Sequence, residues 1–293
     1  MRKHLLLLVT IVITTSASAQ YYVSASGGYT VGSAGVKFGE TITLTNYESN
    51  YGSYGEGFNG QIRFGKFFNK TFGVELGFGY LHGADQTVDK VSVPGKEVEV
   101  KARGRAYGFT PSVVYKFTDN LYGRFGALIK LGGKTEALIY DKSTFAPATA
   151  SALELPVGSY SEVDATVDFH GQLPLGFVGA FGYKHNISNN LDLFIEAEYM
   201  GISVKRKDSE IAEISGGVFL PDGRQVDVFD MDNLPTGWEK KTEYVDELAF
   251  GTVQANGDSL FPAKKLAQRV PYSSFGINFG ITYTFSKKEK STM

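Results

Sequence analysis

Asp168 and His170 are the two residues whose types and spacing could perform catalysis. They are two positions apart, so on a β-strand both side chains point to the same face, as an acid that orients a general base would. No serine lies next to His170 to act as a nucleophile, and no second acidic pair accompanies it. We therefore expect a solvated polar pair and no enzyme activity.

A second group of candidate ligands is the acidic cluster Asp227, Asp230 and Asp232. Calcium prefers sites with several carboxylate oxygens. The spacing does not match an EF-hand loop, however, and no glycine stands at the required turn position. The sequence therefore predicts no metal site, and we expect no cofactor.

The composition excludes further classes of protein. The 293 residues contain no cysteine, which excludes a disulfide framework and a thiolate metal site. The chain has 29 basic and 31 acidic residues, whereas a nucleic-acid binder needs a basic face to neutralise phosphates. The 35 glycines accompany 22 phenylalanines and 17 tyrosines. This combination is unusual for a globular enzyme and favours a periodic, aromatic-rich structure.

The N-terminus has the composition of a secretory signal peptide. Arg2 and Lys3 precede an apolar run from Leu5 to Ile13, and Ala17-Ser18-Ala19 supplies the small residues of a cleavage site. The run is about half as long as a membrane-spanning helix. We expect residues 1–19 to be removed and the remaining chain to be exported.

From residue 20 onward apolar and polar residues alternate, as in β-strands that have one apolar face. In the last segment, six apolar residues from Phe275 to Phe285 alternate with six small or polar residues. The same alternation predicts eight strands, near 21–29, 58–64, 72–80, 107–117, 121–131, 167–184, 191–201 and 275–285.

The connections between these segments are alternately short and long. The short ones are 69–71, 118–120 and 185–190, and the long ones are about 32–57, 83–104, 132–165 and 202–270. Outer-membrane barrels have tight periplasmic turns and long extracellular loops. The sequence therefore predicts an all-β fold, a transmembrane antiparallel up-and-down β-barrel of eight strands with both termini in the periplasm. Further strands within 202–270 are the alternative, but the apolar arms there are shorter than the ~9–11 residues of a spanning strand.

This pattern resembles the small eight-stranded barrels of the bacterial outer membrane, typified by the OmpA membrane domain, OmpX and OmpW. The resemblance rests on the signal peptide, the alternating segments and the closing Ile281-Thr282-Tyr283-Thr284-Phe285. It implies one barrel domain at 20–285 in the outer membrane of a Gram-negative bacterium, inserted by the barrel-assembly machinery. Phe285 is not terminal, because 286–293 add a basic tail that we expect in the periplasm. The family includes anchors, adhesins, channels and a few enzymes, so the resemblance implies an architecture and not a function.

Strand parity assigns many charged side chains to the interior of this barrel. An eight-stranded barrel is about wide enough for its own side chains, so we expect the charges to pair across it in a buried ionic network. A charge-gated constriction is the alternative. The predicted members are Arg63, Glu75, Arg124, Lys130, Glu196 and Glu198, with Lys116, Lys184, Asp168 and Asp192 also on the inner face.

Other side chains are predicted to face the membrane interfaces. Aromatic girdles are common at both interfaces of such barrels, and anionic lipopolysaccharide phosphates attract cations. The periplasmic girdle would contain Phe67, Phe68, Phe72, Tyr115, Phe117, Tyr183, Tyr283 and Phe285, and the outer girdle Tyr29, Phe58, Tyr80, Tyr107 and Tyr199. The cations expected to contact lipopolysaccharide are Lys101, Arg103, Arg105, Lys205, Arg206 and Lys207, unless the first three belong to a solvated hairpin around Pro94-Gly95.

These features predict a non-catalytic integral protein of the outer membrane. We expect it to contribute to membrane structure, or to surface interaction through its long loops, with 202–270 as a binding surface or lid for an extracellular ligand. A narrow porin-like channel for ions or small solutes is the first alternative. A lipid-modifying barrel enzyme, which would use Asp168 and His170, is the second.

Overall fold

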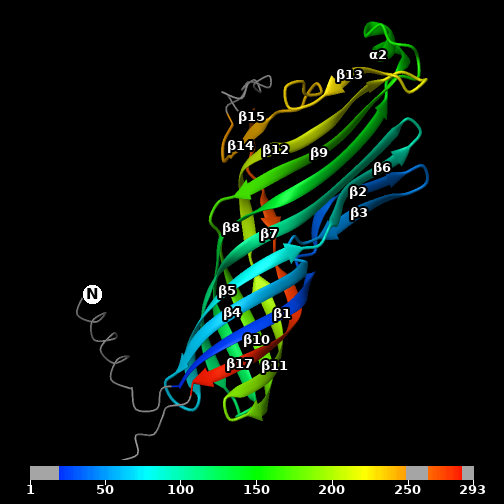
Figure 1. Ribbon diagram of the computed structural model, residues 1–293. Helices are drawn as coiled ribbons and strands as arrows, with labels where there is room; N and C mark the ends of the chain where they lie inside the picture. The colour runs from blue at the N-terminus through cyan, green and yellow to red at the C-terminus, as the bar shows by residue number, and fades with distance from the viewer. Residues whose placement is uncertain (1–19, 249–262, 286–293) are drawn as a thin grey trace, which may run out of the picture.

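The computed structural model describes residues 20–248 and 263–285. The expected signal peptide, the C-terminal tail and residues 249–262 of the last long loop lie outside the described residues. The described chain is almost entirely β-strand, with one short helix, α2 (Pro147–Ala152), and it forms an elongated molecule (Figure 1). No helix in this part of the chain is long and apolar enough to cross a membrane.

Eight strands form a closed ring in which each strand pairs antiparallel with its two neighbours. The predicted all-β class and the closed antiparallel barrel are therefore confirmed. In order around the ring, the strands are β1 (Gln20–Gly32), β4 (Gly57–Phe67), β5 (Phe72–Gly83), β7 (Lys96–Lys116), β8 (Leu121–Thr144), β10 (Leu175–Ser188), β11 (Leu191–Gly201) and β17 (Ser274–Phe285).

The ring closes where the first and last strands of the chain pair. Tyr21 of β1 lies opposite Phe285 of β17, so both ends of the described chain lie at the end of the ring that carries the short turns (Figure 1). Gly28 is required at this seam, because a Cβ atom there would lie 2.2 Å from the carbonyl oxygen of Ile277.

The sheet contains 17 strands, so the predicted total of eight is too low. The remaining nine lie largely in segments predicted as long loops, where polar residues on both strand faces hide the alternation. These strands are β2 (Val36–Thr43), β3 (Tyr47–Gly52), β6 (Gln86–Val93), β9 (Tyr160–Gly171), β12 (Ser203–Phe219), β13 (Gln225–Phe229), β14 (Lys241–Val245), β15 (Ala263–Leu266) and β16 (Arg269–Pro271).

One predicted strand is divided in the structure. The segment 167–184 contains the end of β9, a break at 172–174 and the start of β10. Pro174 lies in the break, where it cannot donate a ladder hydrogen bond. β9 therefore leaves the ring and β10 belongs to it.

Beyond the ring the sheet continues as a second region, which we call the extension. β7 and β8 have 21 and 24 residues, about twice the length of a membrane-spanning strand. Their far halves pair with β6 and β9, and β9 pairs with β12. Two parallel pairs, β2 with β6 and β14 with β15, add outer strands. In Figure 1 the extension forms the upper half of the molecule, with α2 near its tip.

A β-bulge marks the boundary between the ring and the extension. β7 pairs Tyr107 with Gly132 but Gly108 with Lys130, so Leu131 of β8 has no partner. Gly133 follows with a φ of +101°, a backbone conformation that favours glycine. A bulge bends a strand locally and increases its twist, and here it lies where β8 passes from the ring into the extension.

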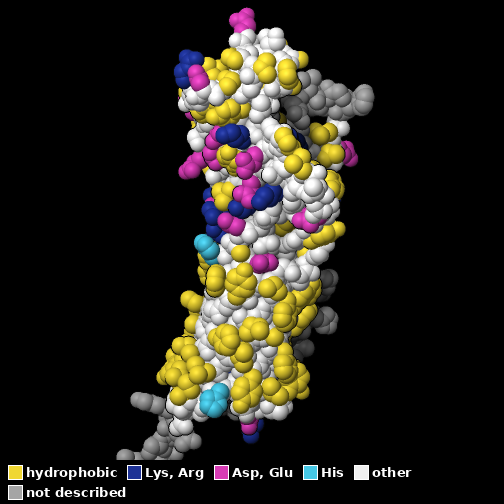
Figure 2. Space-filling view, turned by 90° about the vertical axis from the view of Figure 1, so that its right-hand side faces the viewer, with side chains coloured by type: hydrophobic (Ala, Val, Ile, Leu, Met, Phe, Trp, Pro, Cys, Tyr) yellow, Lys and Arg dark blue, Asp and Glu magenta, His cyan; other side chains and the backbone are white. Residues whose placement is uncertain are grey.

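The outer surface of the ring is apolar. The exposed large hydrophobic side chains on it range from 38% to 74% exposed, and in Figure 2 they gather on the lower half of the molecule, while charged side chains gather above them. We call this surface the apolar belt. It includes Phe58, Ile62, Phe64, Val74, Leu76, Phe78, Val113, Phe125, Phe177, Phe181, Leu193, Ile195, Phe275, Ile277, Phe279 and Ile281.

Aromatic side chains pack against one another at both ends of the belt. Near the short turns the ring centroids of Phe72 and Tyr115 are 5.0 Å apart, and at the other end those of Tyr29 and Phe58 are also 5.0 Å apart. The assignment of Phe67 to a girdle is wrong. Its side chain shares the inner parity of Arg63, is 5% exposed and stacks on Tyr22 inside the ring.

Candidate functional site

Two arginines and three glutamates fill the lumen of the ring. Arg63 Nη1 lies 3.0 Å from Glu196 Oε2, and Arg63 Nε lies 3.8 Å from Glu75 Oε1. Arg124 Nη2 lies 2.9 Å from Glu196 Oε1 and also contacts Glu198, while Arg124 Nε lies 3.7 Å from Glu75 Oε1. All five side chains are at most 5% exposed. We call this cluster the ionic layer.

Neutral side chains donate a further hydrogen bond to each of the three carboxylates. The Tyr22 hydroxyl donates to Glu75 at 2.9 Å, and the Tyr122 hydroxyl donates to Glu196 at 2.8 Å. The Gln61 amide donates to the third carboxylate, that of Glu198, at 2.8 Å. Because buried charges are tolerated only when they are paired and hydrogen-bonded, the surrounding residues are part of what keeps the ionic layer folded.

Two lysines lie between the ionic layer and the short turns. Lys116 Nζ lies 4.1 Å from the centroid of the Phe67 ring. Lys184 Nζ lies 5.2 Å and 5.1 Å from the centroids of Tyr22 and Tyr122. These ammonium groups are therefore held over aromatic faces, a contact favoured by the ring quadrupole, inside the end of the barrel.

Lys130 is not a member of the ionic layer, and its assignment to that network is wrong. Lys130 is 8% exposed, and it makes no ion pair with any residue in 20–248 or 263–285. Its ammonium lies 5.6 Å from the centroid of the Tyr272 ring. The strand alternation correctly places Lys130 on the inner face of the barrel, but it does not give the position along the barrel axis. Lys130 is six positions from Arg124, which is about 20 Å along a strand.

An apolar cluster closes the lumen at the end next to the extension. We call it the mouth cluster, and its buried members are Tyr54, Leu81, Ala102, Ala137, Ile202, Val204 and Tyr272. The Phe38 and Tyr54 rings stack at 4.6 Å, and the Tyr54 and Tyr272 centroids are 5.7 Å apart. The Tyr272 and Thr135 hydroxyls are hydrogen-bonded at 2.6 Å. The lumen is thus filled at two levels.

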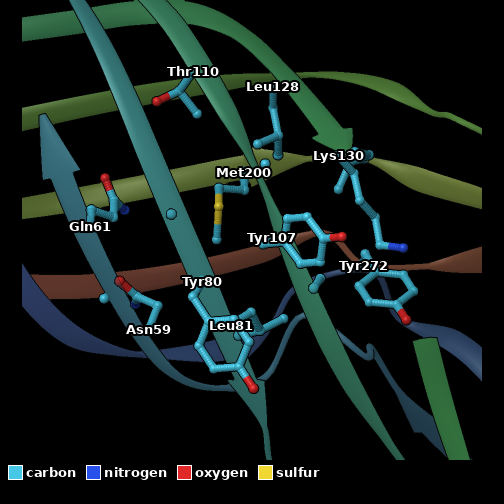
Figure 3. Close-up of a pocket in the computed structure, with 15 residues that line it drawn as sticks. Asn59, Gln61, Tyr80, Leu81, Tyr107, Thr110, Leu128, Lys130, Met200 and Tyr272 are labelled. Atoms are coloured by element: carbon cyan, nitrogen blue, oxygen red, sulfur yellow. The ribbon is translucent and has the colours of Figure 1, made fainter. Parts of the chain in front are cut away.

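A cavity of about 80 Å³ lies between these two levels (Figure 3). Its lining includes Gln61, which is bonded to the ionic layer, and Tyr272 of the mouth cluster. Figure 3 shows Met200 and Tyr107 in the middle of the site, Leu128 above them and Lys130 beside Tyr272. Most of the wall is apolar.

The structure does not bring Asp168 and His170 together as a catalytic pair. His170 Nδ1 lies 2.8 Å from Asp208 Oδ1, because these residues are direct partners across β9 and β12 and such partners are closer than residues two apart on one strand. Asp168 binds Lys134 at 2.8 Å instead. In the described part of the chain, no serine hydroxyl is hydrogen-bonded to His170.

The cations of β7 lie just beyond the outer girdle and pair with carboxylates. Lys101 Nζ lies 3.0 Å from Glu99 Oε2. Arg103 Nε and Arg105 Nε lie 2.7 Å and 3.7 Å from Glu136 Oε2. Each cation therefore already has an acidic neighbour on the outer face of the sheet.

These pairs continue across the sheet as a ladder of alternating charge. Lys134 Nζ lies 3.0 Å from Glu136 Oε1 and 2.8 Å from Asp168 Oδ2. Burial alone would raise the pKa of the Glu136 carboxyl, but hydrogen bonds from Arg103 and Lys134 hold this pKa below its ordinary value. The outer face of β7, β8 and β9 is thus a charged and internally paired surface.

The cations of β12 do not share one face. Lys205 contacts Asp246, and the Lys207 side chain is 66% exposed. The Arg206 guanidinium lies 4.5 Å from the centroid of the Phe169 ring. Arg206 is therefore separated from its two neighbours by the strand alternation.

The acidic cluster stabilises a loop after β13. Asp230 Oδ1 accepts hydrogen bonds from the backbone N–H groups of Asp232 and Asn233 at 2.8 Å and 2.9 Å. Asp227 Oδ1 accepts one from Asn233 Nδ2 at 3.0 Å. Two of these carboxylates thus act as local turn acceptors.

The comparisons with known proteins reveal remote structural similarities. No family model and no curated protein matches the chain. Among solved structures, Acinetobacter baumannii CarO2 aligns at 11% identity with a TM-score of 0.31, covering 90% of this chain and 99% of that one. Ail of Yersinia pestis, in complex with the heparin analogue sucrose octasulfate, aligns at 12% identity with a TM-score of 0.27, covering 91% of this chain and 97% of that one. A Pseudomonas aeruginosa FadL homologue aligns at 12% identity with a TM-score of 0.23, covering 91% of this chain and 89% of that one. All three similarities are remote, so the function proposed below rests on the geometry of this chain.

Proposed function

We propose that the protein is an integral, non-catalytic protein of the outer membrane of a Gram-negative bacterium, and that it holds the extension at the cell surface. The observation that carries the proposal is the distribution of side chains in the ring. The apolar belt faces outward on the ring strands, while the ionic layer is enclosed within them. Soluble proteins rarely expose contiguous apolar patches of more than a few hundred Å², whereas a membrane barrel requires this arrangement.

The surface role is supported by the shape of the extension. Its strands continue the ring sheet on the side opposite the short turns and carry a charged outer face (Figures 1 and 2). In outer-membrane barrels the short turns face the periplasm. The extension would then stand outside the cell, where an extracellular ligand could reach it.

Cysteine labelling tests both the location and the orientation. The chain has no cysteine, so an introduced thiol is a unique label. In intact cells we expect a membrane-impermeant maleimide to label a Ser151→Cys variant, in α2, and not an Asn189→Cys variant, in the turn between β10 and β11. Both variants should react after lysis, which controls for thiol access. Labelling of Asn189→Cys alone in intact cells would reverse the orientation, and recovery of the protein in a soluble fraction would refute the proposal.

Contact between lipopolysaccharide and the β7 cations is part of this proposal. Arg105 lies two residues beyond Tyr107 of the outer girdle, at the level expected for the phosphates. Charge reversal of Lys101, Arg103 and Arg105 to Glu should reduce the lipopolysaccharide that remains bound after purification. Because reversal also breaks the pairs with Glu136, replacement of the same residues by Gln is the control and should give an intermediate loss. Unchanged retention in both variants would remove this contact.

The filled lumen disfavours the channel alternative. The ionic layer is built only by ring strands, so we expect no steady conductance when the refolded protein is inserted into a planar bilayer. Insertion is verified separately by the heat-dependent gel mobility that folded barrels show. Stable single-channel openings of the wild type would replace our proposal with the narrow channel. The enzyme alternative has no support from the partners of His170.

A further inference from the structure

The cavity between the ionic layer and the mouth cluster contains polar groups that have no hydrogen-bond or ion-pair partner among the described residues. Both side-chain amide atoms of Asn59 are buried without a hydrogen-bond partner among the described residues. Lys130, 8% exposed, also lines the cavity and has no ion pair in that part of the chain. Burying a charge or an amide without a partner is unfavourable. The Lys130 ammonium is therefore available to an anionic partner that is not part of the protein, and the Asn59 amide is a second polar group on the cavity wall.

The other side chains that line the cavity indicate the chemical class of this partner. Leu81, Ala106, Leu128, Met200 and Ile202 make most of the wall apolar. A single ammonium group matches a single negative charge, and an apolar wall excludes a ligand that is charged along its length. One water molecule needs about 10–15 Å³ of cavity volume. A cavity of about 80 Å³ therefore has room for about five to eight non-hydrogen atoms of that size.

We propose that the cavity binds a small amphipathic carboxylate of about five to eight heavy atoms. Its carboxylate would accept a charge-assisted hydrogen bond from Lys130 Nζ. Its hydrocarbon part would pack on Met200, in the middle of the site, and on Leu128 above it (Figure 3). This site goes beyond the surface role proposed above, because it lies inside the ring, and either proposal can fail alone.

Binding of hexanoate to the refolded full-length mature protein tests the site. Hexanoate has eight heavy atoms, and hexanamide is a neutral ligand of the same size and shape. Each ligand is present during refolding, so entry through the mouth cluster does not limit occupancy. Binding is then measured by calorimetry in a zwitterionic detergent, with empty micelles as the blank.

We expect hexanoate to bind at least ten-fold more tightly than hexanamide or hexylammonium. The Lys130→Met variant should lose this preference, and it should still fold because it removes an unpaired buried charge while keeping the chain length. Lys184→Met is the matched control. Lys184 is also a lumen lysine, but it lies on the other side of the ionic layer and does not line this cavity, so its loss should leave hexanoate binding unchanged.

Three outcomes would overturn the proposal. They are no binding of hexanoate to the wild type, equal binding of hexanoate and hexanamide, and equal binding of hexanoate to wild type and Lys130→Met. The ligand comparison uses only the wild type, so it decides the matter even if the variant fails to fold. None of these outcomes affects the labelling pattern expected for a surface protein.

Discussion

The Arg124→Met variant is expected to lose about 3–5 kcal/mol of folding free energy, the usual effect of removing one partner of a buried ion pair. Arg124 lies against Glu75, Glu196 and Glu198, and its side chain is 0% exposed. After the substitution one arginine would remain for three buried carboxylates. Methionine replaces the volume but none of the charge, so the loss arises from unpaired carboxylates and not from a cavity.

Urea unfolding in lipid vesicles measures this loss, with the folded fraction read from the gel mobility of unheated samples. Arg103→Met is the matched control, because Arg103 pairs with Glu136 but its side chain is 31% exposed, and pairs of this kind contribute about 0–1 kcal/mol. Adding Glu198→Gln to Arg124→Met should restore part of the stability by removing an unpaired charge. Equal losses for Arg124→Met and Arg103→Met would mean that the ionic layer is not buried as described.

The Phe279→Arg variant is expected to lose about 2–4 kcal/mol in a lipid bilayer, the effect of arginine near the midplane on the lipid face of a barrel. Phe279 is 62% exposed on the ring and lies near the middle of β17 (Ser274–Phe285). In a soluble protein, a change at so exposed a position should be nearly neutral. The sign and size of this effect therefore separate a membrane barrel from a soluble one.

The same vesicle assay measures this effect, with Val226→Arg as the matched control. Val226 is 50% exposed in β13 of the extension, so its substitution should change stability by less than about 0.5 kcal/mol. A large loss of stability for Val226→Arg together with none for Phe279→Arg would place the membrane around the extension and not around the ring. A loss in neither variant would argue against membrane insertion of the ring.

The ring could be predicted from the sequence because its strands have one apolar and one small or polar face, as β17 shows from Phe275 to Phe285. The extension could not be predicted in the same way. β12 contains Lys205, Arg206, Lys207 and Asp208 in succession, and no period of two is visible where both faces contact water or polar neighbours. Its partners in β9 lie 35 to 59 positions earlier in the chain, a separation that no local pattern records.

The candidate site was only partly predictable for a related reason. Parity places Arg63, Arg124 and Glu196 inside the ring, but the depth of a side chain depends on strand register and stagger. For this reason parity alone could not distinguish Lys130 from the ionic layer. Tyr22 and Tyr122 also have inward parity, and a search for hydroxyl donors opposite the predicted carboxylates could have identified them.

β7 and β8 run unbroken in β-structure from the turn at 117–120 through the ring and far into the extension. A force applied at the tip would therefore load these two strands along their length. The hydrogen bonds between the two strands lie perpendicular to that force, so they resist it together in shear. A flexible loop would instead extend under the force, and a hairpin pulled apart from its open end would lose one hydrogen bond at a time. The bulge at Leu131 is the point at which the loaded pair is least regular. The extension is consequently a stiff projection that is anchored mechanically by the strands of the barrel.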